Sequence, residues 1–351
     1  MLKSEILTPA LLLDLDAFEA NLARMMEQVK RSGKAIRPHA KAHKCVEIAK
    51  RQIAAGACGV CVATLAEAEL MASAGITGIL LTSPVADPAK MARVIETGAM
   101  VAVDHVQQVE WYQQAAQAAG RKVDMLIDLD VGDHRTGARS TEQAVEIAEA
   151  ITRSANLNLR GLQGYSAKGS HLAGDEGQQL SRATWAHAAE VRDALKRKGI
   201  ATEIVSGGST GTWQIDTTNP EITEMQAGSF VLMDIEYRKA GSDFPQVITV
   251  LGTVVSANHD KFVTTDAGIK SFSTDRAYPP EAANLPGLTY RFGGDEFGYL
   301  NADDPKNLPR LGQKIEFIPP HCDPTVNLYN RIYACRGDSV EAVWPVKSLT
   351  L

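Results

Sequence analysis

The run Gly59-Val60-Cys61-Val62-Ala63, together with the segment 65–74 that follows it, decides the fold. The run is short, apolar and rich in β-branched residues, which is typical of a buried strand. The following segment is rich in Ala and Glu, and its apolar residues recur with helical spacing. The same alternation repeats from residue 35 onward. We predict strands at 35–38, 59–63, 78–82, 100–103, 123–128, 160–165, 203–206 and 228–233, with helices that include 17–29, 65–74, 108–119, 141–154 and 176–198.

Alternating strands and helices predict a parallel sheet, because a parallel pair of strands needs a crossover connection. Eight such units over roughly 200 residues predict a closed (β/α)8 barrel of the TIM type. An open, doubly wound sheet is the competing arrangement. No G-x-G-x-x-G motif follows an early strand, which disfavours the dinucleotide-binding form of that open sheet.

The pattern of predicted secondary structure changes near the end of the eighth predicted strand. Strand-like runs then follow one another without a long helix, separated by turn signals such as Gly293-Gly294-Asp295. We therefore expect an α/β protein with a barrel over 14–235 and an antiparallel β domain formed by 1–13 and 236–351. Its predicted strands are 246–256, 261–265, 288–292, 314–318, 332–336 and 340–346.

Bulk properties narrow the function class. A net charge of −6 and a pI near 5.8 argue against a nucleic-acid-binding surface, which needs a basic face. No apolar run reaches the roughly 18–20 residues of a membrane span, and the N-terminus lacks the apolar region of a secretory signal. We expect a cytoplasmic protein with neither a membrane nor a nucleic-acid partner.

The cysteines favour a reducing compartment, because five is an odd number and they are thinly spread. Cys58 and Cys61 have C-x-x-C spacing, but no second pair completes a zinc site. We interpret these two as small residues of the protein core.

The octamer Arg37-Pro38-His39-Ala40-Lys41-Ala42-His43-Lys44 follows the first barrel strand. In isolation it also fits a solvated basic turn. In a barrel, however, the active site is built from the loops at the carboxyl ends of the strands. The other loops at that end bring Arg135, Tyr165 and His171 to the same place.

A glycine-rich hydroxyl loop follows the seventh predicted strand, where barrels commonly hold phosphate. Its backbone N–H groups could cradle a phosphate, although a plain turn has the same composition. A lysine facing such a loop predicts pyridoxal 5'-phosphate, because a desolvated amine near other cations forms a Schiff base. We expect Arg135 near the phenolic oxygen of that cofactor. The loop residues predicted to bind the phosphate are Ser206, Gly207, Gly208, Ser209, Thr210 and Gly211.

Taken together, these motifs resemble the D-threonine aldolase family, a member of the fold-type III group of pyridoxal-phosphate enzymes that includes D-serine dehydratases and alanine racemases. The resemblance covers essentially the whole chain, in order, and implies an alanine-racemase-like fold. It rests on the octamer 37–44, Asp130-Val131-Gly132 with His134-Arg135 and Gly137, Gly164-Tyr165 with His171, the loop 206–211, and His321-Cys322-Asp323-Pro324-Thr325.

The resemblance implies that Lys41 carries the cofactor, that Arg135 meets its phenolic oxygen and that Tyr165 faces its pyridine nitrogen. It also implies that His321 and Asp323 hold a divalent metal. His171 would lie beside that metal as a candidate base, although a structural histidine is the plainer alternative. The cofactor is then the electron sink, and the metal acidifies the β-hydroxyl of the substrate.

One imidazole and one carboxylate leave several coordination positions open, which favours Mn²⁺, or Mg²⁺ and similar ions, over a closed zinc site. In the D-serine dehydratase relatives a cysteine stands at the position of Asp323. Here the cysteine is one residue earlier, at Cys322, and we expect its thiol to point away. Phe297 and Lys168 depart from the family pattern; we assign no role to Phe297 and expect Lys168 to be solvated.

The predicted function is therefore a pyridoxal-phosphate and metal-dependent aldolase of D-3-hydroxy amino acids, splitting D-threonine into glycine and acetaldehyde as a homodimer. The alternatives are a D-3-hydroxyaspartate aldolase, a dehydratase of D-serine or 3-hydroxy-D-aspartate, and a non-enzymatic carrier of pyridoxal phosphate. Such carriers lack the β domain and any counterpart of His321 and Asp323.

Overall fold

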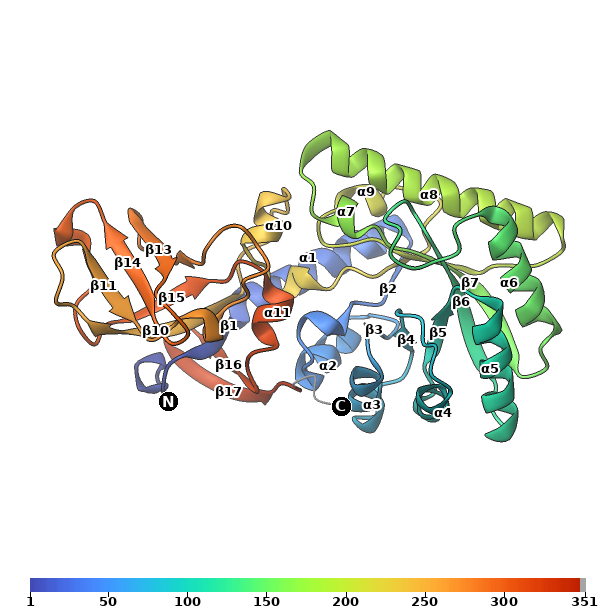
Figure 1. Ribbon diagram of the computed structural model, residues 1–351, viewed down its shortest axis with the longest axis horizontal. Coiled ribbons are helices and arrows are strands. Elements are labelled where there is room, and N and C mark those ends of the chain that lie inside the picture. The colour runs from blue at the N-terminus through green and yellow to red at the C-terminus, as the bar shows by residue number, and fades with distance from the viewer. Residues whose placement is uncertain (348–351) are drawn as a thin grey trace. The chain divides into compact units, whose positions relative to one another are not determined.

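The computed structural model describes residues 1–347, which form two compact units (Figure 1). One unit comprises Arg24–Lys41 and Val46–Gly228. The other comprises Met1–Ala23, Ala42–Cys45 and residues 229–347. No helix among the described residues is long and apolar enough to cross a membrane.

Within residues 1–347, eight parallel strands form the sheet of the first unit. Its two edges are joined by backbone hydrogen bonds of 2.9 Å from Cys58 N to Ile36 O and from Cys61 N to Pro38 O, which close the sheet into a ring. The predicted parallel barrel is therefore confirmed. The strands, in spatial order, are β2 (Ala35–Ile36), β9 (Glu224–Met225), β8 (Ile204–Gly207), β7 (Leu157–Gly164), β6 (Val123–Leu129), β5 (Met100–Val103), β4 (Ile79–Leu81) and β3 (Val60–Val62).

Helices lie between successive strands of the barrel, as Figure 1 shows for α5 and α6. Their starts follow from local chemistry, because side chains at the N-caps accept hydrogen bonds from free N–H groups of the first turn. Thr64 accepts from Glu67 N, and Ser140 accepts from Gln143 N. The helices are α1 (Leu15–Ser32), α2 (Val46–Ala54), α3 (Leu65–Ser73), α4 (Pro88–Thr97), α5 (Val106–Ala118), α6 (Thr141–Arg153), α7 (Ala167–Ser170), α8 (Gly174–Arg197) and α9 (Trp213–Asp216).

The prediction of the eighth strand at 228–233 is wrong. Ser229–Val231 is a 3-10 turn, in which Leu232 N and Met233 N both donate to Ser229 O. The eighth strand is the shorter β9, whose first residue, Glu224, is charged. A short buried apolar run is compatible with a turn as well as with a strand. The true strand was missed because it contains a carboxylate, which is unusual in a buried strand.

The second unit contains a nine-stranded sheet among its described residues. Its strand pairs are antiparallel, as predicted, except that β1 and β16 run parallel. Phe272, Tyr290 and Phe317 form its aromatic core, with pairwise ring centroids 5.6–5.8 Å apart. The strands are β1 (Ala10–Asp14), β10 (Ile248–Ser256), β11 (Phe262–Thr265), β12 (Glu281–Ala282), β13 (Leu288–Phe292), β14 (Gly298–Ala302), β15 (Lys314–Ile318), β16 (Arg331–Arg336) and β17 (Ser339–Pro345); the helices are α10 (Ile235–Lys239) and α11 (Cys322–Val326).

Candidate active site

A cavity of about 290 Å³ opens at the carboxyl ends of the barrel strands. Lys41, Arg135 and Tyr165 come from loops after β2, β6 and β7, and the cavity brings them together. The Lys41 Nζ atom lies 5.5 Å from the centroid of the Tyr165 ring, and the Arg135 Cζ atom lies 5.1 Å from it. Two cations therefore face one aromatic ring across the cavity. The remaining lining residues are His39, Ala63, Thr82, Ser83, Pro84, Asp128, Thr136, Gln163 and Gln226.

The octamer that carries Lys41 is divided by the fold. His39 and Lys41 line the cavity, whereas His43 and Lys44 are buried in the second unit. The His39 ring contacts Thr82 Oγ1 through Nε2 at 3.1 Å and accepts from Lys41 N through Nδ1 at 3.4 Å. This pairing holds the 3-10 turn at Ala40–Ala42 and fixes where the lysine side chain leaves the backbone.

The loop that carries Arg135 is shaped by two carboxylates. Asp130 accepts hydrogen bonds from the backbone N–H groups of Gly132 and His134, both at 3.0 Å. Asp104 accepts from Gly137 N at 2.9 Å. Gly137 has φ +104, and a Cβ there would lie 2.2 Å from Asp130 N, so the turn requires glycine.

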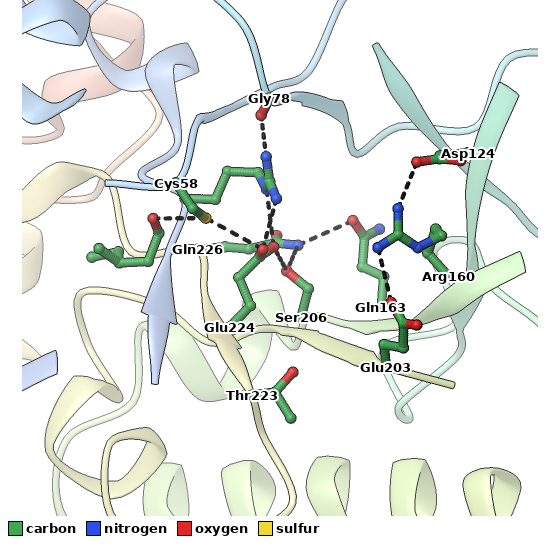
Figure 2. Close-up of polar contacts among 12 residues, drawn as sticks. Cys58, Gly78, Asp124, Arg160, Gln163, Glu203, Ser206, Thr223, Glu224 and Gln226 are labelled. Atoms are coloured by element: carbon green, nitrogen blue, oxygen red, sulfur yellow. Dashed lines mark hydrogen bonds and ion pairs between the residues drawn. The ribbon is translucent and has the colours of Figure 1, made fainter. Parts of the chain in front are cut away.

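Buried polar side chains form the floor of the cavity. Gln163 donates to Asp128 Oδ1 at 2.8 Å and to Thr82 O at 2.9 Å, and Thr136 donates to Asp128 Oδ2 at 2.8 Å. Burial raises the pKa of Asp128 to about 6, although both of these donors favour the carboxylate. Gln226 donates to Gln163 Oε1 at 3.2 Å, a contact drawn in Figure 2. The sequence predicted no role for Asp128 or Gln226, because no motif or spacing marks them.

Ser206 does not join the glycine-rich loop. Its hydroxyl donates to Glu224 Oε1 at 2.7 Å and accepts from Gln226 at 3.0 Å, which directs it into the barrel interior (Figure 2). Of the six residues predicted to bind phosphate, Ser206 and Gly207 belong to β8 itself, and the other four lie in the loop that follows it.

The rest of that loop fits an anion. A Cβ at Gly207 would lie 1.9 Å from Gly164 O, and a Cβ at Gly211 would lie 1.9 Å from Ser170 O, so the loop approaches its neighbours more closely than a side chain allows. The Thr210 hydroxyl is buried and has no hydrogen-bond partner in the described part of the chain. A buried hydroxyl without a protein partner is the feature that a bound phosphate oxygen would satisfy.

Asp216 connects the glycine-rich loop to α8 through hydrogen bonds. Its carboxylate is almost wholly buried and accepts from Ser181 Oγ at 2.7 Å and Trp185 Nε1 at 2.8 Å, both on α8. On the loop side it accepts from Thr212 Oγ1 at 2.5 Å and Ser209 N at 3.3 Å. Burial raises the pKa of Asp216 above its ordinary value, while these four donors favour the ionised form. Nothing in the sequence had singled it out.

His171 ends the short helix α7, and the loop after β6 holds that helix in place. Asp133 accepts from Ser166 Oγ at 3.0 Å and from Ala167 N, which ties α7 to the loop that carries Arg135. Ser170, the residue before His171, packs its carbonyl against Gly211. The candidate base is thus joined to both the arginine loop and the glycine-rich loop. Lys168, on the same helix, is exposed.

His321 and Asp323 lie at the start of α11 in the second unit. Asp323 Oδ1 accepts from Ser229 Oγ and from the Cys322 thiol, both at 3.3 Å, so this thiol lies beside the carboxylate and does not point away from it. Within residues 1–347, no group of three or more His, Cys, Asp or Glu side chains is arranged to hold a metal. An imidazole and a carboxylate two residues apart nevertheless form a donor set suited to an open, partly hydrated divalent ion.

Known proteins match the chain over nearly its full length. A model of the alanine racemase N-terminal domain matches residues 13–235, and a model of a serine dehydratase domain matches residues 248–335. The D-threonine aldolase of an Arthrobacter species is 36% identical over 97% of this chain and 92% of its own length. The chain belongs to the D-threonine aldolase family.

Two further relatives support this membership. A 3-hydroxy-D-aspartate aldolase of Paracoccus denitrificans is 34% identical over 99% of this chain and 93% of its own length. The crystal structure of D-threonine aldolase from Filomicrobium marinum matches with a TM-score of 0.95 and 34% identity, covering 98% of this chain and 95% of that one. This member of the family is accordingly a carbon–carbon lyase that acts as an aldolase on D-3-hydroxy amino acids.

Proposed function

We propose that this protein cleaves D-threonine to glycine and acetaldehyde with bound pyridoxal 5'-phosphate and a divalent metal, Mn²⁺ by preference, as a homodimer. The observation that carries the proposal is the cavity in which Lys41, Arg135 and Tyr165 meet at the carboxyl end of the barrel. When bound, the cofactor supplies the electron sink for the pair left on Cα as the aldehyde departs.

Lys41 is the covalent anchor of the cofactor in this proposal. Its amine lies over the face of Tyr165 and in the same cavity as Arg135, so it is held beside an aromatic ring and near another cation. A neighbouring cation favours the neutral, nucleophilic form of a lysine amine. Arg135 offers a fixed positive charge to the phenolic oxygen of the cofactor, and Tyr165 faces its ring nitrogen. Gly207–Gly211 bind its phosphate, with the Thr210 hydroxyl as a donor.

His321 and Asp323 hold the metal, which would acidify the β-hydroxyl of the substrate. His171 takes the proton from that hydroxyl as the Cα–Cβ bond breaks. The carboxylate at position 323 distinguishes this donor set from one containing a thiolate, which prefers zinc. That difference favours retro-aldol cleavage over dehydration.

Product analysis tests the proposal. Incubation of the purified protein with pyridoxal phosphate, Mn²⁺ and D-threonine is expected to yield glycine and acetaldehyde in equal amounts, and EDTA is expected to abolish both. Chromatography of the amino acid and an alcohol dehydrogenase assay of the aldehyde measure them. Formation of ammonia and 2-oxobutanoate would identify a dehydratase instead. Faster cleavage of D-3-hydroxyaspartate than of D-threonine would identify the alternative aldolase.

Gly208→Ala is expected to weaken binding of pyridoxal phosphate about tenfold or more, since overpacking costs about 1–3 kcal/mol. A Cβ at position 208 would lie 2.5 Å from Asp216 Oδ2, and four hydrogen bonds prevent that carboxylate from moving. Gly199→Ala is the matched control, because Gly199 has the same φ of +75 but nothing within 4 Å of its would-be Cβ. Titration of each variant with the cofactor, followed by visible absorbance, measures the affinity; equal affinities for the two variants would contradict the prediction.

A further inference from the structure

The imidazole of His321 is held by a carboxylate from a distant part of the sequence. Its Nδ1 atom lies 2.8 Å from Oδ2 of Asp275, which is 46 residues earlier in the chain. The side chain of His321 is 15% exposed and that of Asp275 is 40% exposed. The contact therefore joins a mostly buried ring to a carboxylate nearer the surface.

The backbone around His321 is fixed by the same segment. Ser273 Oγ donates to His321 O at 3.2 Å, and His321 N donates to Ser273 Oγ at 3.2 Å. Ser273 N in turn donates to Thr325 Oγ1 at 3.0 Å, in the helix that His321 begins. The segment 273–275 thus contacts both the main chain and the ring of His321, which an incidental surface ion pair does not do.

Arg276 holds the carboxylate in position. Its NH1 atom lies 3.1 Å from Asp275 Oδ2, the oxygen that also meets His321. Its Nε atom lies 3.1 Å from Glu236 Oε2, on α10. The guanidinium therefore links Asp275 to a second element of the same unit, and the carboxylate has a defined place from which to orient the ring.

We infer that Asp275 is a positioning residue that fixes the tautomer and orientation of His321, so that Nδ1–H is held by the carboxylate and Nε2 is the nitrogen offered to a divalent metal. The inference rests on the proposed function, which gives His321 to the metal. A histidine ligand commonly donates its other ring N–H to a carboxylate, which fixes the tautomer and raises the basicity of the ligating nitrogen. Sequence analysis offered no sign of this residue, because no motif joins it to His321.

The test measures metal binding directly. Full-length protein carrying pyridoxal phosphate is freed of metal with EDTA and titrated with Mn²⁺ by calorimetry and by the loss of the free-ion signal in electron paramagnetic resonance. Asp275→Ala is expected to weaken Mn²⁺ binding about 10- to 100-fold. Asp275→Asn keeps an acceptor oxygen of the same reach and is expected to lose less. Affinities of both variants within about twofold of the wild type, or equal losses in both, would overturn the inference.

Two controls separate this result from other effects. Asp295→Asn changes a carboxylate that is 65% exposed and pairs with Lys270, and it is expected to leave Mn²⁺ affinity unchanged. His321→Ala is expected to abolish binding. If His321→Ala retains the wild-type affinity, the proposed metal site itself is wrong; if it loses the metal while Asp275→Ala does not, only the role of Asp275 is wrong. Thermal unfolding of each variant establishes that the fold is kept.

Discussion

Lys41→Ala is expected to lower kcat/KM for D-threonine by on the order of 10³-fold or more, because removal of a covalent catalytic residue has effects of this size. Among the described residues that line the cavity, Lys41 is the only lysine. Its loss leaves the cofactor without a covalent anchor, although Arg135 and the loop 207–211 remain. Three measurements follow from this: steady-state kinetics, the visible absorbance of the bound cofactor, and mass spectrometry after borohydride reduction.

Lys168→Ala is the control for this experiment. Lys168 lies on α7, next to the loops of the cavity, but its side chain is exposed. This variant is expected to keep both the absorbance and the reduced adduct. A borohydride-reducible adduct that persists in Lys41→Ala would mean that another lysine, such as Lys44, is the anchor. That result would also remove the main support for the proposed cofactor geometry.

Most of the fold could be predicted because most barrel strands are short and apolar, and several of the helices between them begin at a capping side chain. The failure at β9 has a physical cause. Its two residues, Glu224 and Met225, pair with both β2 and β8, yet the glutamate is tolerated only because a buried arginine neutralises it. The sequence around Glu224 gives no sign of that arginine, which lies almost 190 residues earlier. The apolar run at 228–233 matches the expected pattern of a strand better, which explains the wrong prediction.

The residues of the candidate site also divide into those that the sequence predicts and those that it does not. That Lys41, Arg135 and Tyr165 line one cavity could be predicted because each follows a strand within a recognisable motif, and the barrel brings such positions together. Asp128, Asp216 and Asp275 could not, because their roles exist only after distant segments have met. Each of them holds other polar groups in place. Sequence reasoning found the candidate chemistry and missed the carboxylates that organise it.

A series of hydrogen-bonded polar side chains, called the polar chain below, crosses the interior of the barrel and connects the candidate site to a buried carboxylate. It runs from Gln163 through Gln226 and Ser206 to Glu224, and Figure 2 shows these side chains pointing toward one another. Barrel interiors are usually filled by branched apolar side chains. Because an unsatisfied member of a buried polar network costs free energy, loss of the glutamate at its far end is expected to destabilise the barrel.

Glu224→Ala is expected to reduce the free energy of unfolding by about 3–5 kcal/mol, the cost of leaving one member of a buried ion pair without its partner. Arg37 donates to Glu224 Oε1 through Nε at 3.1 Å and to Oε2 through NH2 at 2.8 Å. The two side chains are only 7% and 5% exposed. Burial opposes the charge on Arg37, but the hydrogen bonds and charge of Glu224 outweigh it and raise the pKa of the guanidinium. Urea denaturation followed by circular dichroism measures the change.

Glu203→Ala supplies the matched control, because Glu203 pairs with Arg160 at 2.9 Å but is 71% exposed (Figure 2). An exposed pair of this kind contributes about 0–1 kcal/mol, so this variant should unfold close to the wild type. The double variant Arg37→Met with Glu224→Met then separates two causes. If the cost of Glu224→Ala comes from an uncompensated charge, removing both charges should recover most of the lost stability, as replacing a whole buried pair is often neutral or better. If the double variant is as unstable as Glu224→Ala, the geometry of the polar chain, and not the charge of Arg37, is what holds β2 and β9 together.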